Sequence, residues 1–121
     1  MARIIDLPTH TAKRGSLTVI EKVIPLEIKR IFYIYGVDDS VRGGHRHHKT
    51  FQAAICLKGS CVISNNDGHK KEDFILDMPN KCLILEPRDW HSMHDFTPDA
   101  ILMVLASEYF EPTDYIAEEY E

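Results

Sequence analysis

The sequence lacks the features of a membrane protein, a disulfide-stabilised secreted protein or a nucleic-acid-binding protein. No apolar run in its 121 residues approaches the length of a membrane span. The three cysteines are odd in number and have no Cys-x-x-Cys spacing, which argues against a disulfide framework or a thiolate zinc site. A formal net charge of −5 leaves no basic surplus to neutralise nucleic-acid phosphates. We therefore expect a cytoplasmic protein that binds neither membranes nor nucleic acid.

The chain also lacks several common catalytic and domain-dividing signals. It has no Ser-His-Asp pattern, no P-loop and no nucleotide-binding glycine loop, and no internal repeat or linker divides it. Its length, with 44% hydrophobic and 27% charged residues, fits one ordinary globular domain. We expect residues 1–121 to form that single domain.

What the sequence does contain is a series of short strand-like segments. They are rich in β-branched and aromatic residues and are separated by turn signals, of which Asn-Asn-Asp-Gly at 65–68 is the strongest. This pattern predicts an all-β sandwich or barrel, followed by a short helical or irregular acidic tail at 112–121. The predicted strands cover residues 17–23, 29–37, 52–57, 61–64, 71–76, 81–85, 91–96 and 101–106.

The most informative segment is RGGHRHHKTFQAAICLKG at 42–59. His45 and His47 are two residues apart, so on an extended strand they share one face. Their spacing to Gln52 and Gly59 is that of the first cupin motif, in which a carboxylate stands where this chain has Gln52. An amide oxygen is a neutral and weaker metal ligand, so we expect no bound metal and predict acid–base chemistry by the two histidines. A metal held with help from His91, or a purely structural pair, is the alternative.

Arginine and aromatic side chains near this pair are candidate ligand-binding residues. Arg30 and Arg42 suit phosphate, because the arginine fork matches phosphate oxygens. The strand at 29–35 is apolar on both faces, so its parity does not tell whether Arg30 or the Tyr33 and Tyr35 face lines a cavity. Trp90, beside His91, is either a core anchor or a stacking surface for a ring of the ligand.

Two further groups receive a simpler interpretation. Arg46 and His48 alternate away from the histidine pair and are interpreted as solvated loop residues. Tyr109, Tyr115 and Tyr120, in the acidic tail, are interpreted as packing or interface residues.

Taken together, these segments resemble the sugar 3,4-ketoisomerases of the cupin superfamily, which act on thymidine-diphosphate-linked 4-keto-6-deoxyglucose. The resemblance extends from about residue 14 to Tyr115. It is carried by RGSL at 14–17, IKRIFYI at 28–34, RGGHxH at 42–47, CLKGSC at 56–61, WHxMHDF at 90–96 and VLASEY at 104–109. The family often has Ala where this chain has Arg46, and Lys where it has His48.

The resemblance implies a jelly-roll dimer without metal or cofactor, in which an N-terminal strand, here at about 17–23, crosses to the neighbouring subunit. It implies that His45 and His47 move a keto group between C4 and C3 of a thymidine-diphosphate sugar through an enediol, in deoxysugar synthesis for a surface polysaccharide or glycoconjugate. The expected substrate-binding residues are Arg30, Arg42, Tyr33, Tyr35, Gln52, Trp90 and His91. A nucleotide-sugar 3,5-epimerase, a metal-dependent cupin enzyme and a non-catalytic sugar-binding module are the alternative functions.

Overall fold

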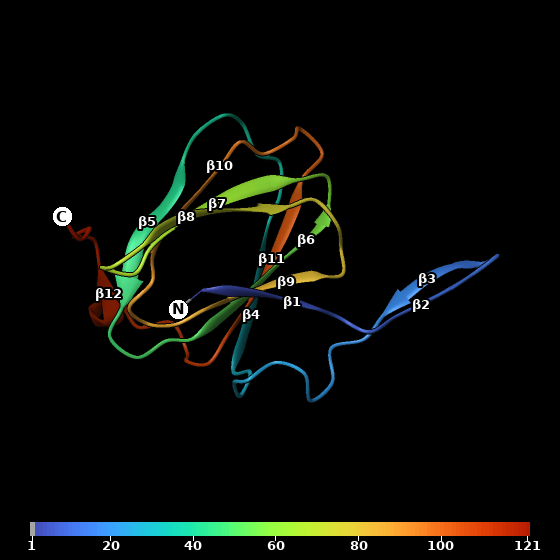
Figure 1. The fold of residues 1–121 in the computed structure, drawn as a ribbon, viewed down its shortest axis with the longest axis horizontal. Helices are drawn as coiled ribbons and strands as arrows, with labels where there is room; N and C mark the ends of the chain where they lie inside the picture. Colours follow the sequence, from blue (N-terminus) through green and yellow to red (C-terminus); the bar gives the residue numbers. More distant parts are fainter. Residues whose placement is uncertain (1) are drawn as a thin grey trace.

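The computed structural model describes residues 2–121, which form two facing five-stranded sheets and a separate two-stranded hairpin (Figure 1). The first sheet has the order β1 (Arg3–Asp6), β9 (Lys81–Leu85), β6 (Gln52–Lys58), β11 (Ile101–Ala106) and β4 (Arg30–Ile34). The second sheet has the order β12 (Tyr115–Ile116), β5 (Arg42–His47), β10 (Trp90–His94), β7 (Cys61–Asn66) and β8 (Lys71–Leu76). The all-β prediction is therefore confirmed.

The hydrophobic core lies between the two sheets. Alternation along the strands sends every second side chain inward, as on β7, where Cys61 and Ile63 are buried while Val62 is only partly buried. Ile63, Leu83 and Leu102 are fully buried members of this core. Complete burial of such a side chain contributes roughly 1.5–3 kcal/mol. The inner faces of the sheets are thus held at a fixed distance from each other.

A second apolar cluster covers the outer face of the first sheet. Strand β6 is buried on both faces, with Ala54 and Cys56 facing inward and Ala53 and Ile55 facing outward. The segment at 19–29 has no strand structure and packs Ile20, Ile24 and Leu26 onto this outer face. The strand predicted at 17–23 is therefore wrong beyond Thr18, because these side chains pack against the sheet instead of pairing in it.

A hairpin near the N-terminus was not predicted from the sequence. Strands β2 (Thr9–Ala12) and β3 (Gly15–Thr18) pair only with each other. Figure 1 shows this hairpin extending away from the barrel, on the side opposite the C-terminus. Its side chains are exposed from Thr9 to Leu17 in the described chain. Such an isolated hairpin is at best marginally stable in water without a packing partner.

The tail is mostly irregular. Its helical structure is limited to the three-residue 3₁₀ turn η1 (Pro112–Asp114), after which two residues pair with β5 as strand β12. The three cysteines, Cys56, Cys61 and Cys82, are buried and free. None of the helical structure in residues 2–121 is long and apolar enough to cross a membrane.

Candidate active site

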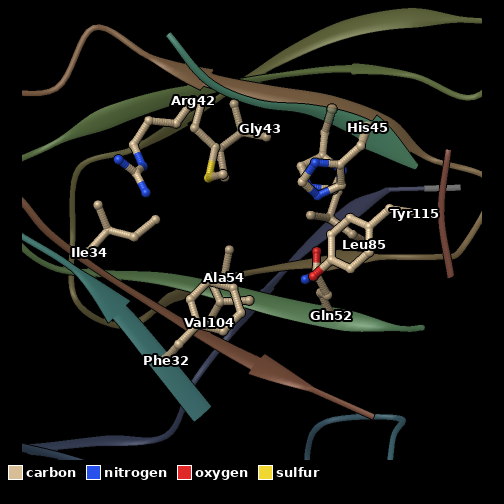
Figure 2. Close-up of a pocket in the computed structure, with 13 residues that line it drawn as sticks. Phe32, Ile34, Arg42, Gly43, His45, Gln52, Ala54, Leu85, Val104 and Tyr115 are labelled. Carbon is tan, nitrogen blue, oxygen red and sulfur yellow. The ribbon is translucent and has the colours of Figure 1, made fainter. Parts of the chain in front are cut away.

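A cavity of about 170 Å³ lies between the inner faces of the two sheets. The second sheet contributes Arg42, Gly43, His45, Ile63, His91, Met93 and Tyr115 to its lining. The first sheet contributes Phe32, Ile34, Gln52, Ala54, Leu85 and Val104. Figure 2 shows Arg42 and Ile34 at one end of the cavity, and His45, Tyr115 and Gln52 at the other. Each end of the cavity is thus lined by side chains from both sheets.

Three imidazoles gather at the end of the cavity that carries Tyr115 and Gln52. The ring centroids of His45 and His47 are 5.0 Å apart, and those of His45 and His91 are 5.1 Å apart. The predicted common face of His45 and His47 is therefore confirmed. His91 joins them because β10 pairs with β5 so that His91 lies opposite His45. His45 and His91 line the cavity directly, whereas His47 is buried behind them, and its Nε2 has no hydrogen-bond partner among residues 2–121.

Burial keeps these histidines neutral. Desolvation is the largest influence on each ring, and it lowers the pKa of His45. It lowers the pKa of His47 to about 4, with further lowering from His45, His91 and Arg30 and an opposing contribution from Asp114. It likewise lowers the pKa of His91 to about 4, opposed by the hydrogen bond between Nδ1 and the Asp89 carbonyl. Near neutral pH the cluster is therefore a set of uncharged bases.

Two consecutive glycines shape the strand that carries the histidine pair. Gly43 and Gly44 both have φ of +80°, a conformation that residues with a Cβ adopt rarely. A Cβ on Gly43 would lie 3.1 Å from the carbonyl oxygen of His91, so only glycine lets β5 approach β10 this closely. The register between β10 and β5 shifts just after His91. The glycines thus bring Arg42 and His45 onto the wall of one cavity.

Sequence reasoning missed the part of the site that comes from the tail. Tyr115, interpreted from sequence as a packing or interface residue, lines the cavity, and its ring centroid is 4.7 Å from those of both His45 and His47. Next to it, the buried Asp114 accepts hydrogen bonds from the Thr50 hydroxyl and the Lys49 amide. Burial raises the pKa of Asp114, but these hydrogen bonds outweigh it and lower the pKa below the ordinary value. No local signal marks Tyr115, because strand pairing across the chain places it.

The predicted substrate-binding residues divide into two groups. Arg42, Gln52 and His91 line the cavity. Tyr33 and Tyr35 lie on the outer face of β4 or just beyond it, exposed by 62% and 69%, and stack on each other. Trp90 is turned away from the cavity, because its neighbour His91 faces inward, and it donates a hydrogen bond to the Ala117 carbonyl. None of these three aromatic residues lines the cavity, so their role in substrate binding stays a prediction.

Arg30 shares the inner face of β4 with Phe32 and Ile34, although it is not part of the cavity lining. Its guanidinium packs 5.5 Å from the centroid of the Phe32 ring and 5.6 Å from that of the Phe110 ring. Its Nε is buried without a hydrogen-bond partner in the described chain. The positive charge of Arg30 also contributes to the lowered pKa of His47.

The donor set suits acid–base chemistry better than metal binding. Within residues 2–121, no three His, Cys, Asp or Glu side chains are arranged to hold a metal ion. The position expected for a carboxylate is filled by the buried amide of Gln52. Neutral imidazole accepts a proton near pH 7 and returns it as imidazolium, so this cavity can abstract and return protons without a charged base.

The chain matches the family described as "FdtA: WxcM-like, C-terminal" over residues 1–121. The chain belongs to this family. A curated relative, the TDP-4-oxo-6-deoxy-alpha-D-glucose-3,4-oxoisomerase of Aneurinibacillus thermoaerophilus, is 43% identical over 117 residues, which cover 94% of this chain and 84% of the relative. The resemblance to 3,4-ketoisomerases is therefore confirmed at the level of the family.

Solved structures place the fold within the same group. A histidine-to-asparagine mutant of the 3,4-ketoisomerase QdtA from Thermoanaerobacterium thermosaccharolyticum, in complex with TDP-4-keto-6-deoxyglucose, is 41% identical with a TM-score of 0.92, covering 97% of this chain and 87% of that one. A 3'-monoepimerase from Streptomyces bikiniensis has a TM-score of 0.82 at 16% identity, covering 94% and 67%. The epimerase shares only the fold, whereas the QdtA structure shares both fold and sequence with this chain. The predicted cupin-type jelly roll is thereby confirmed.

Proposed function

We propose that this protein is a nucleotide-sugar 3,4-ketoisomerase, which moves the keto group between C4 and C3 of a thymidine-diphosphate-linked 4-keto-6-deoxyhexose. The observation that carries the proposal is the cluster of neutral imidazoles on one cavity wall, with His45 facing the cavity and His47 5.0 Å behind it. The 43% identical relative named as such an isomerase supports the reaction and the substrate class. Deoxysugar synthesis for a surface polysaccharide or glycoconjugate is the corresponding role.

The reaction needs only proton transfers. A base removes the C3 proton while the C4 carbonyl oxygen gains a proton, which gives an enediol. An acid then returns a proton to C4 while the C3 hydroxyl loses its proton and becomes the carbonyl. We propose that His45 and His47 share these two roles, because they are adjacent and a neutral ring that takes up the C3 proton becomes an imidazolium that can donate one. The neutral amide of Gln52 and the His91 ring are at hand in the cavity lining to hydrogen-bond the oxygens of the enediol.

Binding of the nucleotide orients the sugar. Arg42 lies at the end of the cavity away from His45, and its fork suits the diphosphate (Figure 2). Holding the diphosphate at that end places the sugar toward the imidazoles, so binding energy from a non-reacting part of the substrate serves the chemical step. The solved QdtA complex with TDP-4-keto-6-deoxyglucose supports a ligand of this class.

Solvent-proton exchange tests this function directly. The purified protein is incubated with TDP-4-keto-6-deoxyglucose in deuterium oxide, and product and recovered substrate are examined by NMR and mass spectrometry. An isomerase yields the 3-keto sugar with deuterium at C3 of the substrate pool and at C4 of the product. Deuterium at C5 would indicate a 3,5-epimerase, and unchanged sugar that still binds would indicate a binding module.

The proposal includes activity without a metal. Elemental analysis of the purified protein should find far less than one equivalent of metal per chain, and chelators should leave turnover intact. Stoichiometric metal whose removal abolishes turnover would instead favour the metal-dependent cupin alternative. We also propose that residues 1–121 act as one domain in the cytoplasm, where the three free cysteines stay reduced.

Assembly as a homodimer with exchange of an N-terminal segment is part of the proposal. The projecting β2–β3 hairpin supports it, and so do the exposed Ile31 and Tyr33 on β4 and Tyr35 just beyond it, since both regions present side chains that a second subunit would cover (Figure 1). The exchanged segment is then the hairpin at 9–18, not the predicted strand at 17–23. Light scattering at micromolar concentration should give twice the chain mass, and a mass near 13.9 kDa would contradict the dimer.

A further inference from the structure

The residues at 112–120, which we call the C-terminal strap, pass along the edge of the second sheet beside β5 (Figure 1). Backbone pairing holds this strap only weakly, because β12 has two residues, with Tyr115 opposite His47 and Ile116 opposite Arg46. At its start, the strap is fixed by the buried Asp114, whose backbone carbonyl accepts a hydrogen bond from the His48 amide. Its remaining length depends on side chains.

Arg46 provides part of that attachment. Further hydrogen bonds to the strap come from the Asn66 amide and the Trp90 indole, and the Tyr120 hydroxyl donates one to the Arg88 carbonyl. The Nε of Arg46 donates a hydrogen bond to the Glu118 carbonyl over 3.1 Å, and its Nη1 donates one to the Tyr120 hydroxyl over 3.3 Å. The guanidinium also stacks 4.3 Å from the centroid of the Tyr120 ring. The ion pair with Glu118 is long, at 3.9 Å, and its carboxylate is exposed, so it contributes little. Arg46, interpreted from sequence as solvated, thus lies against the strap.

The same strand therefore carries two functions on its two faces. His45 and His47 point inward, and Arg46 between them points outward to the strap. The strap in turn places the Tyr115 ring edge-on against both imidazoles, at interplanar angles of 68° and 63°. Tyr115 covers the end of the cavity where the histidines lie (Figure 2). Its ring lies against both imidazoles, with centroids 4.7 Å from theirs, where it can limit their hydration and rotation.

We propose that Arg46 is a positioning residue, which anchors the C-terminal strap and thereby holds the Tyr115 ring against His45 and His47. For its effect on turnover, this inference rests on the proposed isomerase function. Tyr115 acts through the histidines, and Arg46 acts through Tyr115.

Release of the strap has a defined effect on the histidines. The other titratable or charged groups facing the pair are His91 from β10, Asp114 and Tyr115 from the strap, and Arg30 from β4. Losing Asp114 alone would lower the pKa of His47 further, since its carboxylate raises it. Hydration of the rings acts in the opposite direction and is the larger influence, because desolvation is the first cause of the lowered pKa of both. We therefore expect undocking of the strap to raise both pKa values.

The test compares Arg46→Ala with Arg46→Lys and with Arg88→Ala as a matched control. The control variant also loses a guanidinium, but one that pairs with Glu86 and not with the strap. The Arg88 backbone carbonyl, which accepts a hydrogen bond from the Tyr120 hydroxyl, is retained. Strap docking is followed by amide hydrogen exchange at 115–120 and by the emission of the sole tryptophan, Trp90, whose indole binds the Ala117 carbonyl. Histidine pKa values are measured by NMR on the free protein.

Arg46→Ala should speed exchange in the strap by at least about tenfold and raise the pKa values of His45 and His47 toward their ordinary value. The acid limb of kcat/KM for the nucleotide sugar should move to higher pH, and kcat should fall roughly ten- to a hundredfold with a smaller change in KM. Arg46→Lys, which keeps the charge but not the fork, should give intermediate values. Arg88→Ala should match the unmodified protein. Tyr115→Leu should raise the histidine pKa values while the strap stays docked.

Faster exchange in Arg46→Ala with unchanged histidine pKa values and acid limb would overturn the proposal, because Arg46 would then only stabilise the tail. Unchanged exchange would overturn it as well, because Arg46 would not be the anchor. If the unmodified protein fails to isomerise the sugar, the proposed function is wrong. In that case, the exchange and NMR titrations still decide whether Arg46 positions the strap.

Discussion

The two sheets that enclose the cavity present opposite chemistry to each other. The second sheet supplies His45, His91 and Arg42, with His47 behind them, whereas the first sheet supplies mostly apolar side chains and the amide of Gln52. The apolar wall is not passive. It contributes to the burial that lowers the pKa values of the facing histidines and keeps them neutral. One sheet carries the groups that we propose react, and the other helps to keep them uncharged.

Removing the imidazoles from the second sheet should have the largest effect. Asn in place of His45 or His47 keeps much of the side-chain shape but cannot titrate, so each variant should lower turnover by roughly 10²–10⁴-fold. Nucleotide binding should change much less, because Arg42 at the other end of the cavity is retained. Steady-state kinetics and TDP affinity measure the two effects.

The two histidine variants should also differ in kind. Loss of the base at C3 should stop deuterium exchange at C3, whereas loss of the acid at C4 should allow some exchange without product if the enediol forms and returns. Near-normal rates in both variants would make the pair structural and remove the basis of the proposed mechanism.

A change in the core of the first sheet should instead lower stability while leaving catalysis nearly intact. Leu102 is fully buried between the sheets, and its replacement by Ala should lower the free energy of unfolding by about 2–5 kcal/mol. The protein that remains folded should keep most of its kcat, since Leu102 is not part of the cavity lining. Urea denaturation and kinetics check this, with Ile75→Ala on the exposed face of β8 as the control expected to cost well under about 1 kcal/mol.

The contrast between the sheets also explains how far the sequence predicts the molecule. The predicted strands at 71–76, 81–85 and 101–106 coincide with β8, β9 and β11, because their burial follows local patterns of apolar residues. The shared face of His45 and His47 was equally predictable, since it depends only on strand parity. These are properties of single strands.

What the sequence did not predict depends on contacts between distant segments. Tyr115 reaches the histidines because β12 pairs with β5, and Arg46 is partly buried because the same tail lies against it. Trp90 and Tyr33 turn outward because of which face of their strands meets the other sheet. Strand β1 pairs with β9, which lies far from it in the sequence. The residues of β1 are largely exposed, so their pattern gives little indication of a strand. Parity tells which residues share a face, but only the assembled sheets tell which face is inside.

Acid should weaken the fold through the buried histidines. The pKa of both His47 and His91 is about 4 in the folded protein, below the ordinary 6.5 of an unfolded chain. Between these values the unfolded chain binds more protons, so stability is complete above about pH 6.5 and falls as the pH drops toward 4. Each histidine should account for a loss of up to roughly 3 kcal/mol.

Urea denaturation at about pH 7.5 and at about pH 4.5 measures this loss, because only the lower pH lies within the interval where the two states differ in protonation. His47→Asn should reduce the difference in the free energy of unfolding between the two pH values by the amount that His47 contributes. An equal slope in the variant would mean that His47 is hydrated in solution and that the first sheet does not keep it dry.

The smallest expected effect concerns Arg42, which belongs to the second sheet but lies away from its histidines. Arg42→Ala should weaken binding of TDP and of the TDP sugar by roughly 1.5–3 kcal/mol, the range for one charge-assisted contact, and leave kcat at saturation nearly unchanged. Calorimetry with TDP alone isolates the contribution of the diphosphate, and Arg88→Ala, a surface arginine, controls for the loss of charge. Unchanged affinity with a slower chemical step would mean that Arg42 contacts the reacting sugar. The division of the second sheet into a binding end and a reacting end would then be wrong, because Arg42 and His45 would act on the same atoms.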